Sequence, residues 1–88
     1  MNIREKVFKV ISQIMSVPLE TISMDSSPDS IENWDSLRHM NLILDLEQEF
    51  NMQFADDQIV EMLNAELICI GVEEILRTGW VINSGAVG

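Results

Sequence analysis

The segment Trp34-Asp35-Ser36-Leu37, with the run that follows it to Phe50 (WDSLRHMNLILDLEQEF, residues 34–50), decides the fold of this chain. Asp35 is of a residue type that caps helix N-termini, and it ends a long polar stretch. We therefore expect a helix to begin at Ser36, with its hydroxyl exposed near the positive end of the helix dipole. Such a serine suits a site of covalent modification. The residues alone leave a second interpretation open, in which Ser36 is an ordinary N-cap serine.

The run from Ser36 to about Phe50 predicts an amphipathic helix. At about 100° per residue, apolar side chains occupy half of its circumference, with Leu42 at the edge of the polar arc. We expect Leu37 to anchor the first turn in the core, and Glu47, which falls on the apolar side, to bond a neighbouring loop as a boundary carboxylate. The predicted apolar face consists of Leu37, Met40, Ile43, Leu44, Leu46 and Phe50.

Residues 2–16 predict a first helix, because apolar side chains recur there at helical spacing. Asn2 can cap this helix, and Val17-Pro18 ends it, since the residue before a proline is disfavoured in the helical region. Residues 17–35 then form a long loop rich in turn-forming residues. Its expected anchors on the core are Ile22, Met24, Ile31 and Trp34.

Two shorter stretches complete the helical pattern. Asn51 ends the central helix, an extended link buries Met52 and Phe54, and a short third helix runs from Asp56 to about Leu63. A last helix spans about Glu66 to Arg77 and ends at Gly79. The boundary between these two helices stays open, because residues 59–68 can also form one run. The last helix is expected to bury Leu67, Ile70, Val72, Ile75 and Leu76.

The expected fold is therefore all-α: a four-helix bundle of three main helices and a short third helix, with a long loop between the first and second. Eighty-eight residues allow one domain with one modest core. We expect this domain to cover residues 1–79. Residues 80–88 are expected to form a loosely ordered tail.

Composition excludes several classes of protein. Cys69 is the single cysteine and His39 the single histidine, so neither an internal disulfide nor a conventional zinc site is expected. Cys69 is expected to act as a small core hydrophobe. No signal-peptide pattern opens the chain and no apolar run reaches about 20 residues, so a cytoplasmic protein without a membrane span is expected.

The charge is strongly acidic, with a formal net value of −10. No Lys or Arg lies between Arg38 and Arg77, whereas nine acidic residues do. Such a surface repels nucleic acid and anionic membranes and attracts proteins with basic patches. It can also serve solubility alone.

Catalytic arrangements are not supported by the residues present. Asp35, Ser36 and His39 lie within five positions of a helix start, where the base cannot stand between nucleophile and acid. No glycine flanks Ser36 to form a nucleophile elbow. The chain is therefore not expected to be an enzyme, and Ser36 is interpreted as a substrate rather than a catalyst.

Residues 1–79 resemble the acyl carrier proteins and the related peptidyl carrier domains. The resemblance rests on Asp35-Ser36-Leu37 after a loop of the right length, on the helical run 46–50 and on the later helix start at Asp56-Asp57-Gln58-Ile59. It implies that Ser36 carries 4′-phosphopantetheine, added from coenzyme A by a phosphopantetheinyl transferase (holo-synthase). The terminal thiol of that arm then holds acyl or aminoacyl groups as thioesters.

The resemblance also implies partner enzymes that dock basic patches on the second helix and the loop before it. The chain is expected to be a monomer, and its few His and Cys residues predict no metal site. Asp35 and Leu37 would flank the attachment point. The docking candidates are Arg38, Met40, Asn41, Asp45, Glu47, Glu49, Asp56 and Asp57.

One turn departs from the carriers of fatty acid synthesis, which usually have acidic residues soon after the serine. Here Arg38, His39 and Asn41 occupy that turn, and together with Trp34 they favour a free-standing carrier of a specialised pathway. His39 is expected to be a half-exposed packing or recognition residue, and contact with the prosthetic phosphate is the alternative. Two other functions stay open: an aminoacyl or peptidyl carrier, and a non-modified helical adaptor, although this chain keeps Ser36.

Overall fold

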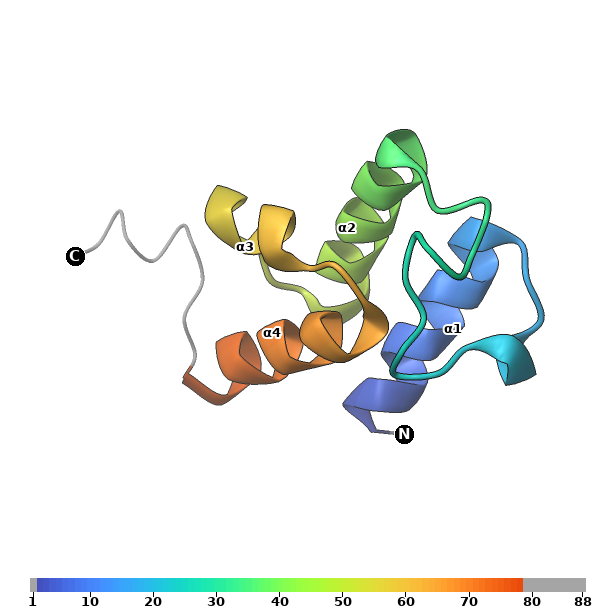
Figure 1. The fold of residues 1–88 in the computed structure, drawn as a ribbon. Coiled ribbons are helices and arrows are strands. Elements are labelled where there is room, and N and C mark those ends of the chain that lie inside the picture. Colours follow the sequence, from blue (N-terminus) through green and yellow to red (C-terminus); the bar gives the residue numbers. More distant parts are fainter. Residues whose placement is uncertain (1, 79–88) are drawn as a thin grey trace.

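The computed structural model describes residues 2–78. This part of the chain contains four α-helices and a short 3-10 turn (Figure 1). No strand occurs in that range, so the all-α prediction is confirmed. Gly79 and the tail 80–88 lie outside the described residues. The elements are α1 (Ile3–Met15), the 3-10 turn η1 (Leu19–Thr21), α2 (Ser36–Phe50), α3 (Asp56–Glu61) and α4 (Ala65–Thr78).

Local side chains and backbone conformations set the ends of the helices. The Asn2 side chain accepts a hydrogen bond from Glu5 N at 2.8 Å, which confirms it as the cap of α1. Ser16 (φ 58°) and Asn51 (φ 54°) adopt left-handed conformations and end α1 and α2. Asparagine tolerates that conformation better than most residues. The prediction that Asn51 ends the central helix is confirmed.

The stretch 59–68 forms two helices rather than one. α3 ends at Glu61, and the Asn64 side chain caps α4 by accepting a hydrogen bond from Leu67 N at 2.8 Å. The short third helix is thus confirmed, although it ends two residues before Leu63. No helix within residues 2–78 combines the length and apolar content that crossing a membrane requires.

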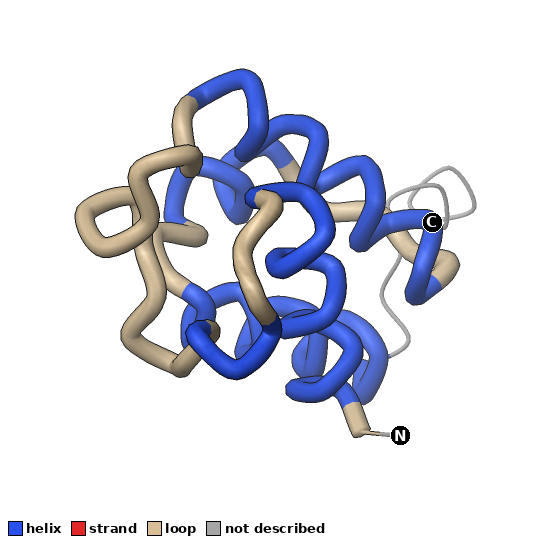
Figure 2. Tube along the Cα trace, turned by 90° about the vertical axis from the view of Figure 1, so that its right-hand side faces the viewer, coloured by secondary structure: helices blue, strands red, loops and turns tan. Residues whose placement is uncertain are grey.

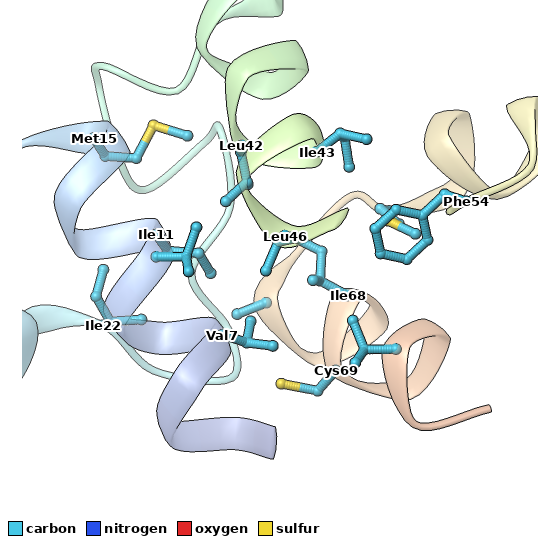
Figure 3. Packing of buried hydrophobic residues seen from close by; sticks show 14 of the residues in the cluster. Val7, Ile11, Met15, Ile22, Leu42, Ile43, Leu46, Phe54, Ile68 and Cys69 are labelled. Carbon is cyan, nitrogen blue, oxygen red and sulfur yellow. The ribbon is translucent and has the colours of Figure 1, made fainter. Parts of the chain in front are cut away.

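The core lies where α1 packs against both α2 and α4. Figure 3 shows Leu42 and Leu46 of α2 turned toward Val7 and Ile11 of α1 and toward Ile68 of α4. Met52 and Phe54 of the link after α2 are buried as predicted. The remaining buried apolar residues are Val10, Met15, Ile22, Ile31, Trp34, Ile43, Met62, Ala65, Cys69, Val72 and Ile75.

The predicted apolar face of α2 is partly wrong. Leu42, placed at the edge of the polar arc, is fully buried, whereas Leu37 is 72% exposed and does not anchor the first turn. Met40 and Leu44 are exposed as well. Leu37, Met40 and Leu44 follow one another at i, i+3 and i+7, so they share a second face that turns away from the core. α2 is apolar on two sides, and only one of them contacts α1 and α4.

The same error affects α4. Leu67, Ile70 and Leu76 were expected in the core, but all three are exposed, while Val72 and Ile75 are buried as predicted. The buried face also includes Ala65, Ile68 and Cys69, which complete an i, i+3, i+4, i+7 stripe. Gly71 of α4 has no side chain, which lets Met62 approach closely. A Cβ at this position would lie 3.3 Å from Met62 Cε.

Cys69 is buried in the core as a small apolar side chain, as predicted. Burial raises the pKa of its thiol from 9.0 to about 11, and the positive charge of Arg4 opposes this only in part. The thiol therefore stays protonated at neutral pH and is a poor nucleophile.

The long loop before α2 is attached to the start of α4. Ile22, Ile31 and Trp34 are buried as predicted, and Met24 packs against the core while half-buried. The carbonyls of Met24 and Ser26 accept hydrogen bonds from Glu66 N and Ala65 N at 3.0 and 2.8 Å. They satisfy N–H groups that the first turn of a helix leaves without partners. Figure 2 shows the loop along one side of the helices.

Two leucines of α2 provide a test of its orientation. Leu46→Ala should lower the free energy of unfolding by about 2–5 kcal/mol, because it leaves a cavity in the core. Leu44→Ala, the matched control on the exposed face, should change it by about 0.5 kcal/mol or less. Urea denaturation followed by circular dichroism measures both values. Similar losses in the two variants would contradict the orientation of α2 described above.

Candidate functional site

Ser36 is the first residue of α2, and its side chain is exposed, as predicted. The first backbone hydrogen bond of the helix joins His39 N to Asp35 O at 2.8 Å. The N–H groups of Ser36 and Leu37 precede that bond and point out of the helix end. A group attached to Ser36 Oγ would therefore stand beside two N–H donors and the positive end of the dipole.

Asp35 is the N-cap of α2. It has an extended backbone (φ −106°, ψ −177°), and its carboxylate accepts a hydrogen bond from Arg38 N at 2.8 Å. Because Asp35 fills the capping position, Ser36 does not act as the cap. The interpretation of Ser36 as an ordinary N-cap serine is excluded, and its hydroxyl is left without that structural role.

Two side chains tie the start of α2 to the end of α1. Arg38 Nη1 donates to Ile14 O at 2.8 Å, and Asn33 Nδ2 donates to Met15 O at 2.8 Å. Both acceptors are carbonyls of the last turn of α1, which have no partner within the helix. Arg38 was predicted as a docking residue, but its half-buried guanidinium supports the junction that holds Ser36 in place.

The predicted docking residues divide into engaged and open side chains. Glu47 Oε2 accepts a hydrogen bond from Phe54 N at 3.0 Å, which confirms it as a boundary carboxylate. Glu49 lies 3.8 Å from Lys6 Nζ, and Asp45 is half-buried. The docking candidates that are exposed to solvent are Met40, Asn41, Glu49, Asp56 and Asp57, and the residues flanking Ser36, Asp35 and Leu37, are exposed as well.

A mainly apolar groove of about 570 Å³ begins directly at Ser36. It runs between the first turns of α2 and the short helix α3. Sequence reasoning missed it, because its two walls are separated by more than a dozen residues and Val60 and Leu63 were assigned only to a helical run. The lining residues are Pro28, Trp34, Asp35, Ser36, His39, Met40, Ile59, Val60, Met62 and Leu63.

His39 is a half-buried packing residue, as predicted. Its ring stacks on Trp34, with centroids 6.2 Å apart and planes at 24°. Nδ1 lies 3.0 Å from Trp34 Nε1, and Nε2 lies 3.3 Å from Ile59 O. Both ring nitrogens therefore have partners within the protein. Within residues 2–78, no group of three or more His, Cys, Asp or Glu side chains is arranged to hold a metal ion.

Comparisons with known proteins identify two similar sequences. No protein-family model matches the chain. A protein named acyl carrier protein from Coprothermobacter proteolyticus is 32% identical over 79 residues, which cover 85% of this chain and 96% of that protein. Another acyl carrier protein, from Buchnera aphidicola subsp. Schizaphis graminum, is 33% identical over 63 residues, which cover 72% and 78% of the two chains.

The chain belongs to the acyl carrier protein family. Its helical bundle is the fold expected of that family. Acyl carrier proteins are non-catalytic carriers, so this chain is not an enzyme. Membership also implies partner enzymes of acyl metabolism.

Proposed function

We propose that this acyl carrier protein bears 4′-phosphopantetheine on Ser36 and carries acyl groups as thioesters on the thiol of that arm. The observation that supports this most directly is an exposed serine at the first position of α2 whose capping role is taken by Asp35. Attachment forms a bond from Ser36 Oγ to the phosphorus next to the pantetheine of coenzyme A and breaks the pyrophosphate bond there. Adenosine 3′,5′-bisphosphate leaves, and the hydroxyl proton goes to the transferase. The pantetheine arm supplies the thiol that holds the cargo.

The residues around Ser36 fit such a group. Its phosphodiester would bring one negative charge to the N–H groups of Ser36 and Leu37, where a helix dipole stabilises an exposed anion by about 0.3–1 kcal/mol. The carboxylate of Asp35 is directed to Arg38 N at 2.8 Å, so part of its charge is already compensated by that hydrogen bond. The groove that begins at Ser36 offers apolar cover for the neutral part of the arm.

We further propose that partner enzymes dock on the exposed face of α2 and the first turn of α3. Leu37, Met40 and Leu44 present an apolar stripe there, and Asp56 and Asp57 lie open on α3. A contiguous exposed apolar surface with charged residues at its rim is typical of protein interaction sites. With a net charge of −10, the chain would attract enzymes with a basic rim around an apolar centre.

The cargo and pathway are proposed from the same turn. The relatives are named as acyl carriers, so an acyl cargo is proposed ahead of an aminoacyl one. Residues 37–41, which follow Ser36, include no acidic side chain. Arg38 and His39 in this turn contact α1, Trp34 and α3. This supports a free-standing carrier for a specialised pathway, whose enzymes would depend more on the apolar stripe than on acidic residues of that turn.

Mass spectrometry tests the attachment site. After incubation with coenzyme A and a broad-specificity phosphopantetheinyl transferase, the chain should gain a single phosphopantetheine. Ser36→Ala should gain none, while Ser30→Ala, an exposed serine of the preceding loop, should be modified like the wild type. Modification that persists in Ser36→Ala, or an unmodified wild type under conditions that modify a known carrier, would overturn the proposal.

A matched pair of leucine substitutions, one on the proposed docking surface and one away from it, tests the docking proposal. Leu37→Asp should lower kcat/KM of the transferase for this carrier by about tenfold or more, because a charge replaces an exposed apolar contact near the centre of the surface. Leu19→Asp alters an exposed leucine on η1, away from that surface, and should leave kcat/KM within about twofold. Equal effects of the two substitutions would argue against docking on this face of α2.

A further inference from the structure

His39 stands between three parts of the fold. It belongs to α2, its Nδ1 faces the indole N–H of Trp34 at the end of the long loop, and its Nε2 faces the carbonyl of Ile59 on α3. The stacking of the two rings adds a contact to the hydrogen bond on the loop side. One side chain thus connects both walls of the groove that begins at Ser36.

The partners of His39 determine where its proton lies. The indole nitrogen of tryptophan is only a donor, so Nδ1 must accept and carry a free lone pair. The proton of the neutral ring is then on Nε2, which can donate to Ile59 O at 3.3 Å. Both contacts exist together only for a neutral imidazole in this tautomer. A second proton on Nδ1 would set two donors against each other at 3.0 Å.

The short helix α3 depends on such external support. It has six residues, and none of them is buried. Ile59 is half-buried against the core, and Val60, in the same wall of the groove, is 71% exposed. The Ile59 carbonyl lies in the last turn of α3, where it also accepts a hydrogen bond from Met62 N, likewise at 3.3 Å. The imidazole therefore caps the C-terminal end of a helix that has little packing of its own.

We propose that His39 is a positioning residue that holds α3 against α2, and that protonation of its ring at Nδ1 releases α3 and widens the groove beside Ser36. The step moves one proton from solvent to Nδ1 and breaks the hydrogen bond from Trp34. To avoid the indole N–H the ring must turn, and turning it withdraws Nε2 from Ile59 O. The position of α3, which forms one wall of the groove, then depends on the protonation of His39.

We assign the response of the groove to pH to His39 itself, because of the charged groups that surround its ring. Asp35 is the one other titratable side chain that lines the groove within residues 2–78, and its carboxylate is bonded to Arg38 N. The guanidinium of Arg38 is turned to α1. None of the acidic residues of α3, Asp56, Asp57 and Glu61, lines the groove. The proposal concerns the unmodified chain and does not depend on whether Ser36 is modified.

NMR on the unmodified full-length chain tests the proposal, and its single histidine makes the imidazole signals unambiguous. Near pH 8 the ring should be the Nε2–H tautomer, with the Trp34 indole N–H protected from exchange. At the acidic pH where the imidazole signals report a protonated ring, amide exchange of Val60 and Met62 should accelerate about tenfold beyond the intrinsic pH effect, the change expected for one lost hydrogen bond. Amides of α1 should not follow.

Two substitutions separate positioning from general stability. His39→Gln keeps an amide donor within reach of Ile59 O but does not titrate, so α3 should stay protected at both pH values. His39→Phe keeps the aromatic contact with Trp34 without the hydrogen bonds, so α3 should exchange fast at both. An Nδ1–H tautomer, unchanged exchange of α3 on protonation of the ring, or a pH response that persists in His39→Gln would overturn the proposal.

Discussion

The junction between the end of α1 and the start of α2 is the constraint on which the site depends. Asp35 caps α2, while Arg38 and Asn33 reach back to the last carbonyls of α1. These groups satisfy backbone atoms at two helix ends that would otherwise have no partner within their helices. Because the cap and the ties to α1 come from neighbouring residues, Ser36 is left exposed on a fixed helix start rather than on a loose loop.

Apolar residues that are not part of the core form an exposed face of α2. A chain of this size buries one modest core, and α1, α2 and α4 complete it around Leu42 and Leu46. Leu37, Met40 and Leu44 remain on the outer face of α2, next to the groove that α3 closes. Exposed apolar side chains near the proposed attachment point have a cost in solubility, which the charge of −10 offsets. The same charge favours encounters with basic partners.

Local signals in the sequence were sufficient for the helices and for several of their ends, but they left the boundary between α3 and α4 open. Asn2, Asp35 and Asn51 act as residue types that cap or end helices, and each does so in the structure. Glu47 also bonds a neighbouring segment, since a carboxylate at the edge of an apolar face needs a donor. Burial of the loop anchors Ile22 and Trp34 followed from isolated apolar residues in a polar stretch.

Periodicity was not sufficient where a helix is apolar on two sides. In α2 and α4 the leucines lie around more than half of the circumference, so the pattern does not show which side meets the core, and Leu37, Leu42 and Leu67 were misplaced. The sequence also did not predict contacts between residues that are far apart in the chain. Arg38 bonds a carbonyl 24 positions away, and His39 bonds one 20 positions away. Neither pairing leaves a signal in a single sequence, because backbone carbonyls are present at every position.

The central claim is that the start of α2 holds a phosphopantetheine on Ser36. Comparing amide NMR spectra of the unmodified and modified chains tests it most directly. The account predicts the largest shifts at the N–H groups of Ser36 and Leu37, with smaller ones along the groove at Met40 and Val60 and none in the core face of α1. Shifts centred on another part of the chain, or none at the N–H groups of Ser36 and Leu37, would contradict it.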